Sequence, residues 1–157
     1  MNNRLAPTII KAGLIVGTLD ILSAILYFYL KTGKRGFVTI PKYIASAAFG
    51  KQAYSAGAEM IFAGFIFHYV IAFAFTIFFF WLYPRINFFS KSNILTGIIY
   101  GVFTWAIMNL IIVPLSKIGS KPFDFSGASI NALILVVCIG IPLAFMANRF
   151  YKTNKSG

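Results

Sequence analysis

Long apolar runs separated by short basic stretches dominate this chain. Four of the runs, at residues 12–30, 61–83, 94–115 and 130–150, are each near the ~20 residues that a helix needs to cross ~30 Å of hydrocarbon. Helices are expected because a backbone exposed to lipid must satisfy its own hydrogen bonds. The pattern predicts an all-α integral membrane protein with four transmembrane helices in a single membrane domain over residues 1–157.

The connection between the first two spans is rich in small residues. Ten of the fourteen residues at 45–58 are Ala, Gly or Ser, and Pro41 precedes them. Because Pro is favoured at the first turn of a helix, we expect an extra helix over about residues 41–58. This segment is too polar and too small to span, so it either lies at the membrane interface or dips between the main helices.

The composition supports a membrane protein and restricts its partners. Hydrophobic residues make up 59% of the chain, which is more apolar surface than a soluble core of this length buries. Fourteen Lys and Arg outweigh three acids, and the formal net charge is +11. Basic flanks of spans fix orientation and attract anionic headgroups. We expect membrane lipids with anionic headgroups as partners and no nucleic acid, because the cations are scattered.

The distribution of Lys and Arg does not decide the orientation by itself. The N-terminal flank, the second loop and the C-terminal tail together hold seven, and the first and third loops together hold seven. Because the first loop is long and is expected to fold, its charges carry less weight. We therefore predict that both termini lie in the cytoplasm.

An acid, Asp20, stands near the middle of the first apolar run. A charged residue at that depth costs about 2.5 to 3.5 kcal/mol and usually faces protein or a polar path. With about 1.5 Å of rise per residue, the depths of Asp20 and His68 allow them to meet as an ion pair or a shared-proton pair. Alternatively, Asp20 bonds a nearby hydroxyl or amide and fixes the helix register, and His68 is a satisfied core residue.

Two asparagines extend this idea to the other spans. Asn109 is placed roughly 9 Å from the end of the third span, on the side where Asp20 and His68 could meet. Asn131 begins the fourth span above it. The predicted polar intramembrane layer comprises Asp20, His68, Asn109 and Asn131.

Small residues recur at helical spacing in three of the spans. Such stripes allow two helix backbones to approach closely. Asp20 falls on the stripe of the first span and His68 on that of the second, so both are expected to point at protein. The predicted helix-packing residues are Gly13, Gly17 and Ala24, then Gly64 and Ala72, then Gly97 and Gly101.

Motifs for catalysis or metal binding are missing from the sequence. With one Cys and one His, the chain has no HxxxH, HExxH, CxxC or CxxCH spacing. No motif singles out a base-activated nucleophile. We expect no enzymatic activity, no metal and no cofactor.

Several short segments carry a resemblance. The segments GTLDI, VPLS, KPF and GIPLAF are similar to those of a family of small, uncharacterised four-helix bacterial inner-membrane proteins, with a more distant similarity to YagU-like proteins. The resemblance implies four helices in a bacterial inner membrane. It does not imply a reaction, and it does not identify a functional residue in this chain.

Two classes of function follow from these patterns. The favoured one is a noncatalytic helix-packing subunit or assembly factor of a membrane complex, whose small-residue faces bind partner helices. The alternative is a small oligomeric transporter or channel, in which Asp20 and His68 link protonation to the passage of a small solute or ion. Because 157 residues are few for a complete carrier, either a homo-oligomer or a membrane-protein partner is expected.

Overall fold

The computed structural model describes residues 4–119 and 124–153, which form helices joined by turns, with no strand among them. Four helical segments are long and apolar enough to cross a membrane: Leu5–Thr32, Ala58–Arg85, Asn93–Leu115 and Phe125–Thr153. The prediction of an all-α multi-pass membrane protein is confirmed at this level. The KPF segment at residues 121–123 lies outside the described residues.

Each long segment is assembled from one or more helices. The first is α1 (Leu5–Thr32) and the second is α4 (Ala58–Leu82), which two 3-10 turns, η1 (Tyr83–Arg85) and η2 (Asn87–Ser90), connect to the third. The third comprises α5 (Asn93–Ala106), the π-helix η3 (Ile107–Ile112) and α6 (Val113–Leu115). The fourth comprises α7 (Phe125–Leu135), the π-helix η4 (Val136–Gly140) and α8 (Ile141–Thr153).

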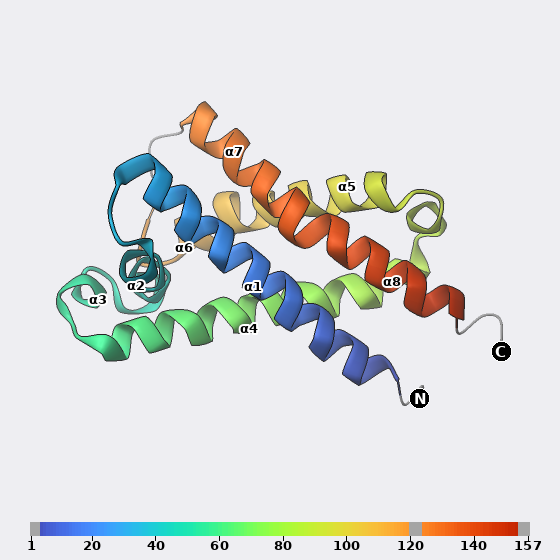
Figure 1. The fold of residues 1–157 in the computed structure, drawn as a ribbon, viewed down its shortest axis with the longest axis horizontal. Helices are drawn as coiled ribbons and strands as arrows, with labels where there is room; N and C mark the ends of the chain where they lie inside the picture. The colour runs from blue at the N-terminus through green and yellow to red at the C-terminus, as the bar shows by residue number, and fades with distance from the viewer. Residues whose placement is uncertain (1–3, 120–123, 154–157) are drawn as a thin grey trace.

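Helix α1 occupies the middle of the arrangement (Figure 1). It contacts α4 on one side and the η4 and α8 parts of the fourth segment on the other, and α5 packs on the fourth segment. Both ends of the chain lie at the end of the molecule where α4 connects to α5, which we call the terminal end. The opposite end, which carries the first and third loops, is called the loop end.

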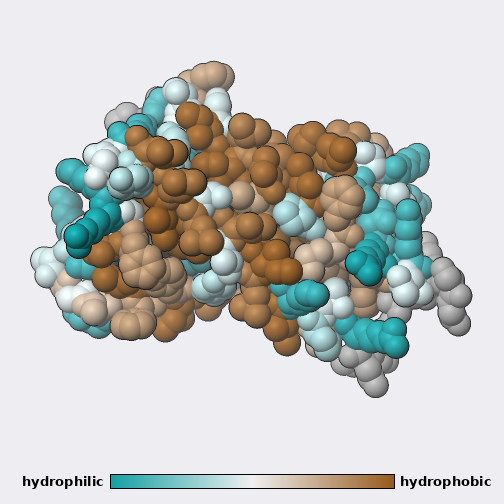
Figure 2. Space-filling view, in the orientation of Figure 1, coloured by the Kyte–Doolittle hydropathy of each residue, from teal (hydrophilic) through white to brown (hydrophobic). Residues whose placement is uncertain are grey.

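Buried aromatic side chains join the helices at the terminal end. The ring centroids of Phe79 and Tyr100 lie 4.4 Å apart, and the Tyr100 hydroxyl donates a hydrogen bond of 2.6 Å to the carbonyl of Phe75. On the face shown in Figure 2, apolar residues predominate between the two ends, and polar residues gather at both ends. Such a surface is suited to contact with lipid. Within lipid, helices are held together by close packing and hydrogen bonds and not by the hydrophobic effect.

The helix of the first loop differs from the predicted one in its bounds. Helix α2 (Gly36–Phe49) begins before residue 41 and ends at Gly50, and a short α3 (Gln52–Ser55) follows. Pro41 lies inside α2 instead of at its start. The helix stops at Gly50 because this residue has a φ of 68°, a conformation that glycine adopts without a steric penalty.

Helix α2 crosses the long helices and ties two of them together at the loop end. Where the long helices run across the view, α2 is seen end-on (Figure 1). It packs chiefly against α4 and α1, and the amide of Lys117, just after α6, donates a hydrogen bond of 3.0 Å to the carbonyl of Ala47. The first-loop helix therefore links the second and third long segments.

Both π-helices end two residues before a proline. Pro114 follows η3 and Pro142 follows η4, each with one residue between. A proline has no N–H to give to the carbonyl four residues earlier, and its ring clashes with that carbonyl. Widening the preceding turn to a π-helix accommodates the ring. In both segments the side chains of the π-helix therefore point in other directions than they would in a regular helix with 3.6 residues per turn.

Candidate functional site

Asp20 lies near the middle of α1 and faces the inside of the bundle. Its side chain is half-buried and lies within electrostatic reach of His68 on α4. On the turns around it, Gly17 contacts α4, and the Ser23 hydroxyl lies 3.1 Å from the thiol of Cys138 in η4. Asp20 stands between these two positions on the helix, so it points toward the seam where α1, α4 and η4 meet.

His68 is held in a single orientation by the backbone of α1. Only 8% of the residue is exposed, and its Nε2 atom lies 2.7 Å from the carbonyl oxygen of Gly17. A carbonyl oxygen only accepts hydrogen bonds, so Nε2 must carry the proton. The other ring nitrogen, Nδ1, is then the atom that gains or loses a proton.

The small residues on α1 and α4 make this contact possible. A Cβ atom added at Gly17 would lie 3.0 Å from the Tyr69 ring and 3.2 Å from the Cβ of Ala72. One added at Gly13 would lie 2.5 Å from the Phe73 ring. Because Gly13 and Gly17 have no side chain, α1 comes close enough to α4 for its backbone to reach the imidazole of His68.

The other predicted packing residues also lie at contacts within the chain. Gly64 lies against the Pro41 carbonyl of α2, where any Cβ would collide with backbone. Gly97 and Gly101 face Ile141 and Val136 of the fourth segment. The packing partner that sequence reasoning missed is Gly140, whose close approach to the Gly97 carbonyl completes this crossing. Ala24 is half-buried on α1.

The structure does not bring the two asparagines to the Asp20 and His68 pair. Asn109 is exposed, and its amide donates a hydrogen bond of 3.0 Å to the Trp105 carbonyl of its own helix. Asn131 is exposed on α7. The layer was predicted for a bundle in which the third span reaches the first two, but η3, which carries Asn109, makes its main contacts with α5 and α6 of its own segment. Asp20 and His68 lie within electrostatic reach of each other, but among the described residues no salt bridge or hydrogen bond joins them directly, so the predicted ion pair or shared-proton pair is not formed in this structure.

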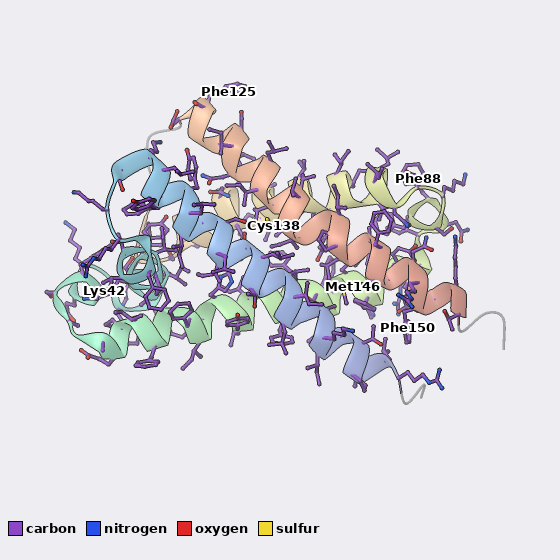
Figure 3. All side chains as sticks on the ribbon, viewed as in Figure 1. Lys42, Phe88, Phe125, Cys138, Met146 and Phe150 are labelled. Atoms are coloured by element: carbon purple, nitrogen blue, oxygen red, sulfur yellow. The ribbon has the colours of Figure 1, made fainter. Side chains whose placement is uncertain are left out.

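The hydroxyls next to Asp20, which were expected as its possible hydrogen-bond partners, contact other residues instead. The Thr18 hydroxyl lies 2.8 Å from the Tyr69 hydroxyl, and Ser23 contacts Cys138, which lies where α1 and the fourth segment meet (Figure 3). These hydroxyl residues stand two positions before and three positions after Asp20 in the sequence. Nothing in the sequence indicated that Cys138 would be the partner of Ser23, because η4 sets the direction of the cysteine side chain.

The chemistry available at this centre is proton exchange. One carboxylate and one imidazole lie within electrostatic reach of each other inside an apolar bundle, and both groups can bind and release a proton. Within the described residues, no group of three or more His, Cys, Asp and Glu is arranged to hold a metal ion. The pair therefore resembles a proton site more than a ligand cage.

Comparison of the chain with protein-family models, curated proteins and solved structures found no match. The fold and the four apolar segments define a multi-pass membrane protein. Its function is argued from the site itself, because a fold alone does not imply a function.

Proposed function

We propose that this chain is a small transport protein of a bacterial inner membrane, in which Asp20 and His68 link the movement of a proton to the passage of a small ion or solute. The observation that carries the proposal is the hydrogen bond of His68 to the Gly17 carbonyl beside Asp20. It fixes one nitrogen of the imidazole as a donor and leaves the other to exchange a proton.

The free-energy cost of placing the Asp20 carboxylate in the middle of a span has to be offset by another interaction. A carboxylate in the middle of a span costs about 2.5 to 3.5 kcal/mol on insertion scales, and such residues mark ion pathways and proton relays. An imidazolium partner offsets the charge of Asp20. When Asp20 or His68 gains or loses a proton, its charge changes, and so does the free energy of keeping it inside the bundle. This difference can shift the balance between two conformations of the protein.

A path for the solute is proposed to lie between copies of the chain. An open groove of about 580 Å³ follows the outer face of α4, from Phe65 to Ile77, and its lining does not include Asp20 or His68. A second pocket, at the terminal end, does not include them either. A homo-oligomer that packs on this face of α4 would enclose the groove, and the small size of the chain also suggests self-association.

The second candidate is a noncatalytic subunit or assembly factor of a membrane complex. The positions of the two cavities favour this candidate, because neither cavity is lined by Asp20 or His68. The glycine faces expected to bind partner helices contact helices of the same chain. On this second proposal a partner has to contact the chain elsewhere, and the pair serves only to fix the register of α1 and α4.

Reconstitution into vesicles separates the two candidates. The purified protein is placed in vesicles that contain a pH-sensitive dye, and a potassium diffusion potential drives protons inward. We expect proton flux above that of empty vesicles for the wild type, loss of this flux in Asp20→Asn, and wild-type flux in Asp124→Asn, a control that makes the same change at an exposed acid of the loop end. Wild-type flux equal to that of empty vesicles would favour the subunit.

A further inference from the structure

A polar pocket opens at the terminal end, away from the Asp20 and His68 pair. It has a volume of about 90 Å³ and lies between the η1 and η2 turns and the last turns of α8. Figure 3 shows Phe88 and Phe150, which belong to these segments, at the same end of the molecule. The polar residues that line the pocket are Tyr83, Asn87, Ser90, Asn148 and Lys152.

The walls of this pocket are fixed by contacts among their own residues. The Tyr83 ring stacks on that of Tyr151 at 5.5 Å with an angle of 8° between the planes. The Tyr151 hydroxyl donates a hydrogen bond of 2.6 Å to the Phe80 carbonyl. The amide of Asn148 donates one of 2.6 Å to the Asn93 side chain. The pocket is therefore formed before any ligand enters it.

One hydroxyl in the pocket wall lacks a good hydrogen bond. Tyr83 is only 4% exposed, and its hydroxyl lies beside the Asn148 amide. Within the described residues no hydrogen bond of normal geometry reaches this oxygen. Buried polar atoms nearly always have a partner, so this hydroxyl in the pocket wall is a hydrogen-bonding group that no other described residue uses.

The charge around the pocket is positive. Lys152 lines it, and Arg149 lies one turn before Lys152 on α8. Among the described residues, both Glu59 and Asp124 belong to the loop end, and the terminal end carries no acid. The described cations toward the terminal end are Arg4, Lys11, Arg85, Lys91, Arg149 and Lys152.

We propose that this pocket binds a negatively charged phosphate group, from either the headgroup of an anionic phospholipid or free inorganic phosphate. A cavity needs roughly 10 to 15 Å³ of space of this kind to hold one water, so the pocket has room for a group of a few oxygens and is far smaller than a typical ligand site. A hydroxyl, amides and an ammonium in one small space suit an ion with several acceptor oxygens. Its place at the end of the spans suits a headgroup.

Native mass spectrometry of the full-length protein tests the proposal. The protein is exposed separately to phosphatidylglycerol, to phosphatidylcholine and to inorganic phosphate, and bound adducts are counted. We expect the wild type to retain phosphatidylglycerol or phosphate over phosphatidylcholine. Tyr83→Phe keeps the stacked ring and removes only the hydroxyl, and should weaken retention about tenfold because a hydrogen bond to a charged group is lost.

Two further variants make the result decisive if Tyr83→Phe is unstable. Lys152→Gln should weaken retention similarly, whereas Lys91→Gln, a cation at the same end that does not line the pocket, should leave it unchanged. Retention of phosphatidylglycerol without phosphate assigns a lipid headgroup, and displacement of the lipid by phosphate assigns a free anion. Equal losses in Lys91→Gln and Lys152→Gln, or no preference over phosphatidylcholine, would overturn the proposal.

Discussion

The Nε2 atom of His68 lies 2.7 Å from the carbonyl oxygen of Gly17, across two helices and 51 positions along the chain. The bond relies on glycine, because a larger residue at position 17 would push Tyr69 and Ala72 away. It also defines the chemistry of the centre, since the nitrogen held by the carbonyl cannot be the one that takes up a proton. Asp20 is within electrostatic reach of the same ring.

The tautomer of His68 is directly observable. The chain has one histidine, so nitrogen-15 labelling of histidine gives signals from a single ring. When the ring is neutral, we expect the proton on Nε2 and none on Nδ1, because the Gly17 carbonyl requires a donor. A spectrum of the neutral ring with the proton on Nδ1 would contradict the geometry described.

Substitution of Gly64 should destabilise the protein more than substitution of Gly17. In Gly64→Ala the new Cβ meets the Pro41 carbonyl, a backbone atom of α2 that cannot move alone. In Gly17→Ala it meets the Tyr69 and Ala72 side chains at 3.0 to 3.2 Å, and Tyr69 can shift. We expect Gly64→Ala to lower the free energy of unfolding by about 1 to 3 kcal/mol and Gly17→Ala to lower it less.

Thermal unfolding in detergent measures this difference. Cys138 is buried and is the one cysteine of the chain, so a thiol-reactive dye reports when the bundle opens. Equal melting temperatures for Gly64→Ala and the wild type would mean that α2 does not pack on α4 as described. A bulky residue at position 17 cannot serve as a test of oligomer assembly, because it collides with α4 inside the same chain.

The π-helix before Pro142 should control the reactivity of Cys138. In Pro142→Ala the missing donor is restored and the clash with the Cys138 carbonyl is removed, which allows a regular helical turn. That turn would rotate Cys138 away from Ser23, so we expect faster labelling by a membrane-permeant maleimide. Pro114→Ala, which relieves the other π-helix, is the matched control and should label at the wild-type rate. Unchanged labelling of Pro142→Ala would show that the proline does not set this turn.

The orientation is tested by fusions at the C-terminus. We expect a green fluorescent protein fused there to fluoresce and an alkaline phosphatase fused there to be inactive, because both report a cytoplasmic terminus. A fusion placed in the first loop after Gly33 should give the reverse result. Active phosphatase at the C-terminus would reverse the predicted orientation and put the phosphate-binding pocket on the outer side.

The sequence predicted the spans better than it predicted the site. Apolar length is sufficient to identify the four segments. Gly13 and Gly17 of the first glycine stripe lie against α4, where both helices are regular. Asn109 was placed in the layer because all four spans were assumed to share one centre, whereas the third segment packs mainly on the fourth. The α2 bounds were also missed, since composition alone does not indicate that Gly50 takes a positive φ.

The most direct test of the central claim is a double-mutant cycle on proton flux in vesicles. The wild type, Asp20→Asn, His68→Gln and the double variant are compared under the same imposed potential. If the two residues act as one unit, each single variant should lose nearly all of the flux and the double variant should lose no more, because effects of coupled residues do not add. Independent, additive losses, or full flux in Asp20→Asn, would contradict a functional pair.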